Sequence, residues 1–359
     1  MPVPLPIDRP VRLAVVGAGQ ISELVIPAYL DHPDIQIVGV CDREPERLSR
    51  WSGALPDTLM TADLAELLAV APDVVDVLVP TPNHADVATS VLDAGFHVQV
   101  QKPFARDVEG ADQMLSAAER AGASLSILED YLCYPPLRRL AEIASSGEIG
   151  EPVGLHMKIV ATGRGGWDVN PTSFEWQFDQ ARDGRGMLVF DHGWHQLALA
   201  ISLFGPIRRI FGWIGSTEVA PGIVMDAPST LVWEHANGVR AVLEISFALD
   251  TYFRSTHYTG DERVEVTGSR GFVRCNRISA CGIQEPSVVV YRDGETHSYH
   301  SLEDTPPDAF AAMAADSAAY FRGERGRPVM SGVEGRSILT ALLAALESAR
   351  RDAPVDVIE

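Results

Sequence analysis

Hydrophobic and polar positions change their spacing at about residue 150 of the chain. Before that point, short apolar runs alternate with segments of helical period, which is typical of βαβ units and a parallel sheet. The first two of these runs are nearly continuous, as expected for strands that are covered on both faces. The predicted strands are Leu13–Val16, Ile35–Val40, Val74–Val79, His97–Val100 and Ser124–Leu128. The predicted helices lie near Ser22–Leu30, Ala62–Leu68, Ala85–Asp93 and Val108–Ala121.

After about residue 150 the apolar positions alternate, which indicates half-buried strands. Glycine turns at residues 236–238 and 268–271 predict antiparallel hairpins. The predicted strands are Val153–Val160, Ile207–Ile214, Ser229–His235, Val239–Phe247, Arg263–Thr267, Gly271–Arg274 and Ser287–Tyr291, and the predicted helices are about His192–Leu203, Asp308–Arg322 and Val333–Ala349. We therefore expect an α/β protein. Residues 1–130 form a doubly wound Rossmann domain, and residues 131–359 form an α+β domain with a large, mainly antiparallel sheet, whose C-terminal helix could pack back on the first domain.

Composition and charge narrow the class of partner. The 359 residues suffice for two domains, and 29 basic against 49 acidic residues give a net charge of −20, which disfavours nucleic acid and anionic membranes. No apolar run approaches the length of about 18 residues of a membrane span. The first residues lack the basic and apolar parts of a secretory signal, so we expect a cytoplasmic protein that binds a small molecule. Four cysteines far apart, without a C-x-x-C pair, give no zinc spacing and are expected to be buried: Cys41, Cys133, Cys275 and Cys281.

A glycine loop directly follows the first predicted strand. Gly17 permits a tight turn, Gly19 lets the backbone approach a pyrophosphate, and Ser22 stands where a third small residue is usual. Such a turn also joins strands and helices that bind no nucleotide, so the loop alone is weak evidence. Asp42 strengthens it, because an acidic residue about 20 positions further on meets the adenosine ribose. Its carboxylate favours NAD over NADP, whereas neighbouring Arg43 could reach a 2′-phosphate and leaves NADP as the alternative.

Three further motifs follow in order at residues 80–84, 101–103 and 186–195. With the glycine loop, they resemble the glucose-fructose oxidoreductase and inositol dehydrogenase family (Gfo/Idh/MocA) over nearly the whole chain. The resemblance implies hydride transfer between NAD(P) and a hydroxyl-bearing carbon of a sugar, polyol or sugar acid. It implies a cofactor site of Gly17, Gly19, Gln20, Ile21, Asp42, Arg43, Thr81, Pro82, Asn83, His84, Gln101 and Lys102. It also implies catalytic Lys102, Asp191 and His195, a substrate site of Trp176, Asp191, His192 and His195, and no metal.

The residue types suit that chemistry. Oxidation of an alcohol needs a base for the hydroxyl proton and a donor at the developing carbonyl oxygen. Asp191 and His195 are four positions apart at a predicted helix start and would share one face, and Lys102 could help to relay the proton. Asp191 could instead cap the helix, and His195 could be a core histidine. Five aromatic residues could stack on sugar or form core: Trp167, Phe174, Trp176, Phe178 and Trp194.

Four departures from the family pattern concern the substrate more than the chemistry: Gln101 for Glu, Gln177 after Trp176, Ala198 for Asp, and Leu132–Cys133 for Arg–Phe. The neutral Gln101 suggests a bias toward sugar acids or oxidised sugars. Other readings are a redox-neutral enzyme that retains NAD, a non-catalytic NAD-binding sensor, and a metal-dependent isomerase or hydrolase with ligands Asp191, His192 and His195. An exposed sheet face predicts a homo-oligomer, a dimer or tetramer.

Overall fold

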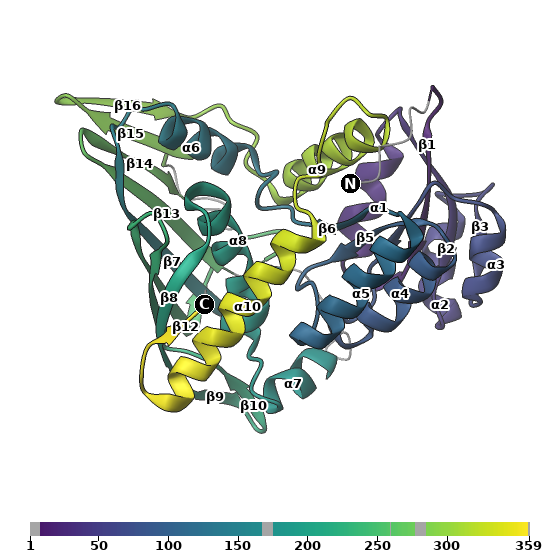
Figure 1. The fold of residues 1–359 in the computed structure, drawn as a ribbon, viewed down its shortest axis with the longest axis horizontal. Helices are drawn as coiled ribbons and strands as arrows, with labels where there is room; N and C mark the ends of the chain where they lie inside the picture. The colour runs from purple at the N-terminus through teal and green to yellow at the C-terminus, as the bar shows by residue number, and fades with distance from the viewer. Residues whose placement is uncertain (1–7, 167–174, 259, 277–284, 358–359) are drawn as a thin grey trace. The chain divides into compact units, whose positions relative to one another are not determined.

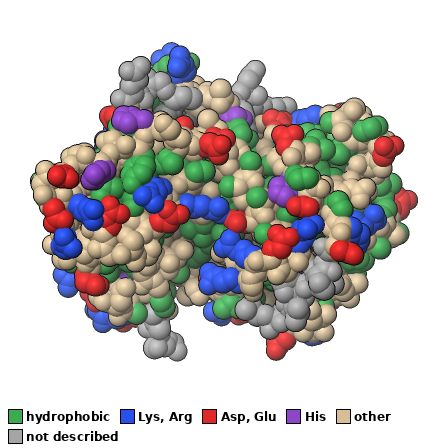
Figure 2. All heavy atoms as spheres, turned by 90° about the horizontal axis from the view of Figure 1, so that it is seen from above, with side chains coloured by type: hydrophobic (Ala, Val, Ile, Leu, Met, Phe, Trp, Pro, Cys, Tyr) green, Lys and Arg blue, Asp and Glu red, His purple; other side chains and the backbone are tan. Residues whose placement is uncertain are grey.

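A computed structural model describes residues 8–166, 175–258, 260–276 and 285–357. The chain divides into two compact units, which we describe separately. The first unit comprises Met1–Cys133 and Phe310–Leu339, and the second comprises Tyr134–Ala309 and Thr340–Glu359. No helix of the described residues is both long and apolar enough to cross a membrane. Acidic and basic side chains lie intermixed on the face that Figure 2 presents.

The first unit is built on a six-stranded parallel sheet of order β3-β2-β1-β4-β5-β6 (Figure 1). The order reverses direction at β1, so right-handed crossovers place the helices before and after β4 on opposite faces. This confirms the predicted Rossmann sheet. Its strands are β1 Val11–Val16, β2 Ile35–Cys41, β3 Leu59–Thr61, β4 Val74–Val77, β5 His97–Gln101 and β6 Leu125–Leu128. Its helices are α1 Ser22–Leu30, α2 Pro45–Ser52, α3 Leu64–Ala69, α4 His84–Asp93 and α5 Val108–Ala121.

Near its C-terminal end the chain returns to the first unit, because residues Phe310–Leu339 belong to that unit. A single boundary at residue 130 does not describe this return. Helix α9 (Pro306–Phe321) places Ser317 Oγ 2.7 Å from Gln99 Oε1 of β5. The hydroxyl groups of Tyr320 and Ser124 lie 2.8 Å apart. Helix α10 (Gly332–Arg351) begins in this unit and ends in the second.

The second unit contains a nine-stranded sheet of order β16-β15-β14-β13-β7-β12-β11-β8-β17, in which only the β7–β12 pair of the described strands is parallel. This confirms the mainly antiparallel sheet. Alternate side chains of β7, such as Leu155 and Met157, are buried, and those between them, such as His156, are exposed. The strands are β7 Pro152–Arg164, β8 Ile207–Ile214, β11 Ser229–His235, β12 Arg240–Tyr252, β13 Gly260–Gly268, β14 Gly271–Asn276, β15 Val288–Arg292, β16 Glu295–Tyr299 and β17 Val355–Asp356. A separate hairpin pairs β9 Thr217–Ala220 with β10 Ile223–Met225.

Helices cover the buried face of this sheet. They are α6 Pro135–Ser145, α8 Gly193–Phe204 and the second half of α10, whose Ser348 Oγ accepts a hydrogen bond from the backbone of Gly212 in β8. Helix α7 Glu175–Arg182 lies beside β10 and the turn before α8. A π-helical turn, Met187–His192, precedes α8, where the sequence predicts a helix from His192. Cys41, Cys133 and Cys275 are buried as expected, and Cys281 lies outside the described residues.

Candidate functional site

The loop after β1 needs its two glycines for different reasons. Gly17 has φ 103°, and a Cβ atom there would lie 2.7 Å from the carbonyl carbon of Leu78. At Gly19, a Cβ atom would meet no heavy atom of the described residues within 4 Å apart from its chain neighbours, so the loop is open on that side. Ser22 is buried and its Oγ donates to the carbonyl oxygen of Gly19 over 2.6 Å. The third motif position thus accepts serine because its hydroxyl group is satisfied within the loop.

Asp42 directly follows β2, and its side chain links the glycine loop to the end of that strand. Its Oδ2 accepts a hydrogen bond from the backbone N–H of Ala18 over 2.7 Å, and its Oδ1 accepts one from Glu44 over 2.9 Å. Each oxygen keeps a further lone pair for a ribose hydroxyl group. Arg47 of α2 lies 3.7 Å from Oδ2, whereas Arg43 is exposed. Arg47 was not among the predicted site residues, because α2, with Leu48 and Trp51 as its buried side chains, was itself not predicted.

The turn after β4 carries the next predicted cofactor residues. Thr81 is buried, and its Oγ1 atom has no hydrogen-bond partner among the described residues. Pro82 and Asn83 are exposed beside it in a single 3-10 turn. An open glycine loop, a carboxylate at the end of β2 and a buried hydroxyl group without a partner fit a dinucleotide. Two other predicted cofactor residues, Gln20 and Ile21, stand directly before α1.

His84 connects this turn to the turn that carries Lys102. One ring nitrogen, Nδ1, lies 3.0 Å from the carbonyl oxygen of Pro103, and the other, Nε2, lies 2.8 Å from that of Val79. The side-chain oxygen of buried Gln101 accepts a hydrogen bond from the backbone N–H of Lys102 over 2.7 Å. The ring of His84 thus contacts the backbone of both segments, the one after β4 and the one that carries Lys102. Its predicted contact with the cofactor stays a prediction.

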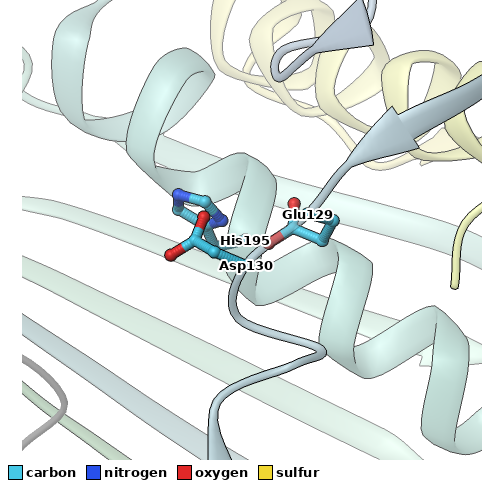
Figure 3. Close-up of side chains that lie close together, drawn as sticks. All are labelled: Glu129, Asp130 and His195. Atoms are coloured by element: carbon cyan, nitrogen blue, oxygen red, sulfur yellow. The ribbon is translucent and has the colours of Figure 1, made fainter. Parts of the chain in front are cut away.

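Two buried carboxylates, Glu129 and Asp130, directly follow β6 and therefore lie at the carboxyl edge of the parallel sheet. Figure 3 shows both side chains on this segment, and it shows His195 on α8 of the second unit. The Oε1 atom of Glu129 accepts a hydrogen bond from the backbone N–H of Tyr131 over 3.1 Å. These carboxylates were not among the predicted site residues, although two acids directly after an apolar strand are a usable signal.

In the second unit, Asp226 holds the π-helical turn that carries Asp191. The carboxylate of Asp226 accepts hydrogen bonds from the backbone N–H groups of Leu188 and Val189 over 2.9 and 2.7 Å. A Cβ atom at Gly186 would lie 2.1 Å from this carboxylate, so glycine is needed there. Burial raises the pKa of Asp226 above its usual range. Asp226 stands 35 positions after Asp191, and no motif indicates it.

The side chain of Asp191 is held by Gln177 of α7, whose Nε2 donates to Oδ2 over 2.9 Å. Asp191 lies within the π-helical turn, and the residue before α8 is His192, so Asp191 does not cap that helix. Trp176 is half-buried beside Gln177, whereas Trp194 is fully buried and belongs to the core. Trp167 and Phe174 lie outside the described residues.

The two histidines of this motif lie beside each other. Their rings meet edge to face, with 5.7 Å between centroids and 80° between planes, and His195 is buried. The Nε2 atom of His192 lies 2.6 Å from Oε1 of Glu262, a buried residue of β13. Within the second unit, the structure thus brings Asp191, His192 and His195 onto one turn and the helix start that follows it.

Two family profiles match the chain. The profile of the oxidoreductase family with an NAD-binding Rossmann fold matches residues 11–128, and that of the GFO/IDH/MocA C-terminal domain matches residues 137–274. D-apiose dehydrogenase of Paraburkholderia graminis is 27% identical over 356 residues, which cover 96% of this chain and 89% of that protein. D-glucoside 3-dehydrogenase of Escherichia coli is 34% identical over 265 residues, 68% of this chain and 72% of that protein.

Solved structures show the same fold. An oxidoreductase from Agrobacterium radiobacter, crystallised with NAD+, L-tartaric acid and magnesium, aligns with a TM-score of 0.81 over 97% of this chain and 98% of that one. The two chains are 21% identical, so this likeness concerns the fold.

Proposed function

Because this chain belongs to the Gfo/Idh/MocA family of oxidoreductases and has its NAD-binding Rossmann domain, we propose that it transfers a hydride between NAD and a hydroxyl-bearing carbon of a sugar, polyol or sugar acid. The observation that carries the proposal is a continuous set of contacts along one sheet edge. Gly17 packs against the backbone after β4, and His84 links that backbone to the turn of Lys102. The cofactor loop and the lysine are thereby held at the same edge.

We assign the dinucleotide to the carboxyl edge of the first unit. The pyrophosphate would meet the backbone of Gly17, Gly19, Gln20 and Ile21 at the start of α1, and Asp42 would bind the adenosine ribose. Thr81, Pro82, Asn83 and Gln101 would line the nicotinamide half. When bound, the nicotinamide accepts or donates the hydride. Asp42 favours NAD, because a 2′-phosphate about 4 Å from a carboxylate costs on the order of 4 kcal/mol at an effective dielectric constant of about 20.

We assign the proton chemistry to Lys102, Asp191 and His195. An imidazole titrates near neutral pH and can accept the hydroxyl proton, a step that typically contributes about 10²- to 10⁴-fold to the rate. Asp191, held by Gln177, would orient a substrate hydroxyl group, and Trp176 and His192 would contact the substrate beside it. The names of the apiose and glucoside dehydrogenases support a sugar-like substrate.

The test is NAD+ reduction with a panel of sugars, inositols and aldonates. Lys102→Met and His195→Asn should each lose most turnover and still bind NAD+. The chain has a single other lysine, Lys158, which is exposed on β7, so Lys158→Met is the matched control and should retain activity. Absence of NADH formation with the whole panel would contradict the proposal, as would full activity of the Lys102 variant.

We further propose a homo-oligomer that pairs the exposed sheet faces of the second unit. Trp213 of β8 is 59% exposed there and meets Phe211 edge to face at 4.5 Å. An apolar surface of this kind is costly to leave in water. Light scattering should show a dimer or tetramer, and Trp213→Glu should shift it toward the monomer.

A further inference from the structure

Glu262 of β13 is a buried carboxylate that binds two side chains at the start of α8. Its Oε1 lies 2.6 Å from Nε2 of His192, and its Oε2 accepts a hydrogen bond from Nε2 of Gln196 over 2.7 Å. The side chain of Glu262 is 2% exposed and that of His192 is 25% exposed. An ionised carboxylate only accepts hydrogen bonds, so this contact places a proton on Nε2 of His192. In neutral His192, Nδ1 is then the atom that can accept a proton.

This arrangement prepares an imidazole for acid–base chemistry. A carboxylate behind a histidine fixes its tautomer and ring orientation, and it stabilises the imidazolium that forms when the other nitrogen takes a proton. Burial of Glu262 reduces the screening of this charge by water. The imidazole also lies in the candidate site, because it follows Asp191 directly and its ring contacts that of His195.

Two titratable groups near Glu262, Cys275 and Tyr134, add no charge of their own. Burial raises the pKa of the Cys275 thiol, with Glu262 as a further cause. Burial also raises the pKa of Tyr134, with Cys275, Asp304, Glu262 and Asp308 as smaller causes. Both groups are therefore protonated and neutral near pH 7. Asp191 and His195, on its own segment, are further titratable groups beside His192.

We propose that His192 is a second acid–base residue of this site, with Nδ1 as the proton acceptor, and that Glu262 is its positioning residue. The inference rests on the proposed function, which supplies the alcohol and NAD+. The hydroxyl O–H bond breaks and an N–H bond forms at Nδ1, while the hydride of the C–H bond leaves to NAD+. The alcohol is thereby oxidised to a carbonyl compound, and the imidazolium is matched by the carboxylate of Glu262.

The first test needs no substrate. In the full-length protein labelled with 15N-histidine, NMR should show the Nε2–H tautomer of neutral His192, and His192→Gln assigns its signals. Glu262→Gln should lower the titration midpoint of His192 by about one pH unit or more, because the imidazolium loses its counter-charge. The control is the exposed pair His297 and Glu295 of β16, 3.9 Å apart and toward the opposite edge of the sheet from Trp213, where Glu295→Gln should change the titration of His297 far less because water screens it.

The second test uses D-apiose, methyl β-D-glucoside and myo-inositol as probes with NAD+. With any probe that is oxidised, Glu262→Gln should lower kcat, shift the acid limb of the pH profile downward and leave NAD+ binding unchanged. An unmoved acid limb overturns the inference. If no probe is oxidised, the proposed function is contradicted, and the NMR experiment still tests the inference. An Nδ1–H tautomer of His192 in the unmodified protein overturns the inference, because the unmodified protein has no folding defect that could explain it.

Discussion

Asp76 lies in the middle of β4 and is fully buried in the first unit. Its Oδ2 accepts a hydrogen bond of 2.5 Å from the hydroxyl group of Tyr29, and its Oδ1 has no hydrogen-bond partner among the described residues. Burial raises the pKa of Asp76 from 3.8 to about 7, although the bond from Tyr29 acts in the opposite direction. Ionisation of Asp76 therefore lowers the free energy of unfolding of the protein.

The size and sign of this cost follow from the two pKa values. The folded value exceeds the unfolded value, so the folded state binds more protons between pH 3.8 and about pH 7, and stability falls as pH rises through this window. A difference of about 3 units corresponds to about 4 kcal/mol. Asp76→Asn removes the charge and keeps an oxygen that can accept from Tyr29. The variant should be more stable than the parent by up to about 4 kcal/mol at about pH 8 and by about 2 kcal/mol at about pH 5.

Urea unfolding followed by circular dichroism at several pH values measures this gain. Asp73 supplies a control of opposite sign, because its carboxylate binds Arg9 and the backbone N–H of Arg12, and these contacts hold its pKa below the usual value despite burial. Asp73→Asn should therefore destabilise the protein at neutral pH, and the loss should shrink as pH falls through the pKa of Asp73. A stability difference for Asp76→Asn that is independent of pH, or a loss at pH 8, would refute the reasoning.

Further predictions concern the two site elements. Asp42→Ala should weaken NAD+ binding by about 10- to 100-fold, because it removes a ribose acceptor and the anchor of Ala18, and it should relax the preference against NADP+. Calorimetry in which the unmodified protein binds NADP+ as tightly as NAD+ would contradict this. Gly186→Ala and Asp226→Asn should each raise the substrate KM and leave NAD+ affinity unchanged, since both disturb the turn that holds Asp191. Equal losses in NAD+ affinity would instead indicate general unfolding.

The first unit was largely predictable because its signals are local. Buried parallel strands are continuous apolar runs. The amphipathic helix α5 ends directly before Gly122, so the predicted Val108–Ala121 agrees with it. The predicted Ser22–Leu30 agrees with α1, which follows the glycine loop directly. Helix α2 escaped prediction because Leu48 and Trp51 are its buried side chains and most of its surface is polar. Pro45 in its first turn and the spacing of Leu48 and Trp51 were nevertheless local signals for this helix.

The site of the second unit was less predictable because its supports are distant in sequence. The π-helical turn depends on Asp226, and a local pattern of apolar residues predicts an ordinary helix instead. The importance of Glu262 could be predicted in part from the sequence. It shares the buried face of β13 with Val264 and Val266, and a charged residue in that register must have a partner. Only the fold shows that the partners are His192 of the π-helical turn and Gln196 of α8.

Of the four departures from the family pattern, Gln101 in place of Glu has the clearest consequence for the substrate. Its side-chain oxygen accepts from the backbone N–H of Lys102, a contact that a glutamate oxygen could make equally well. Gln101→Glu should therefore preserve the turn and add a buried negative charge one residue from the lysine. That charge stabilises the ammonium form, so the alkaline midpoint of activity should rise by about one pH unit, and an anionic substrate should bind less tightly. A neutral polyol should be affected much less. If the pH–rate profile does not move and aldonates and polyols keep their order, Gln101 acts on the shape of the turn alone and the expected preference for sugar acids is wrong.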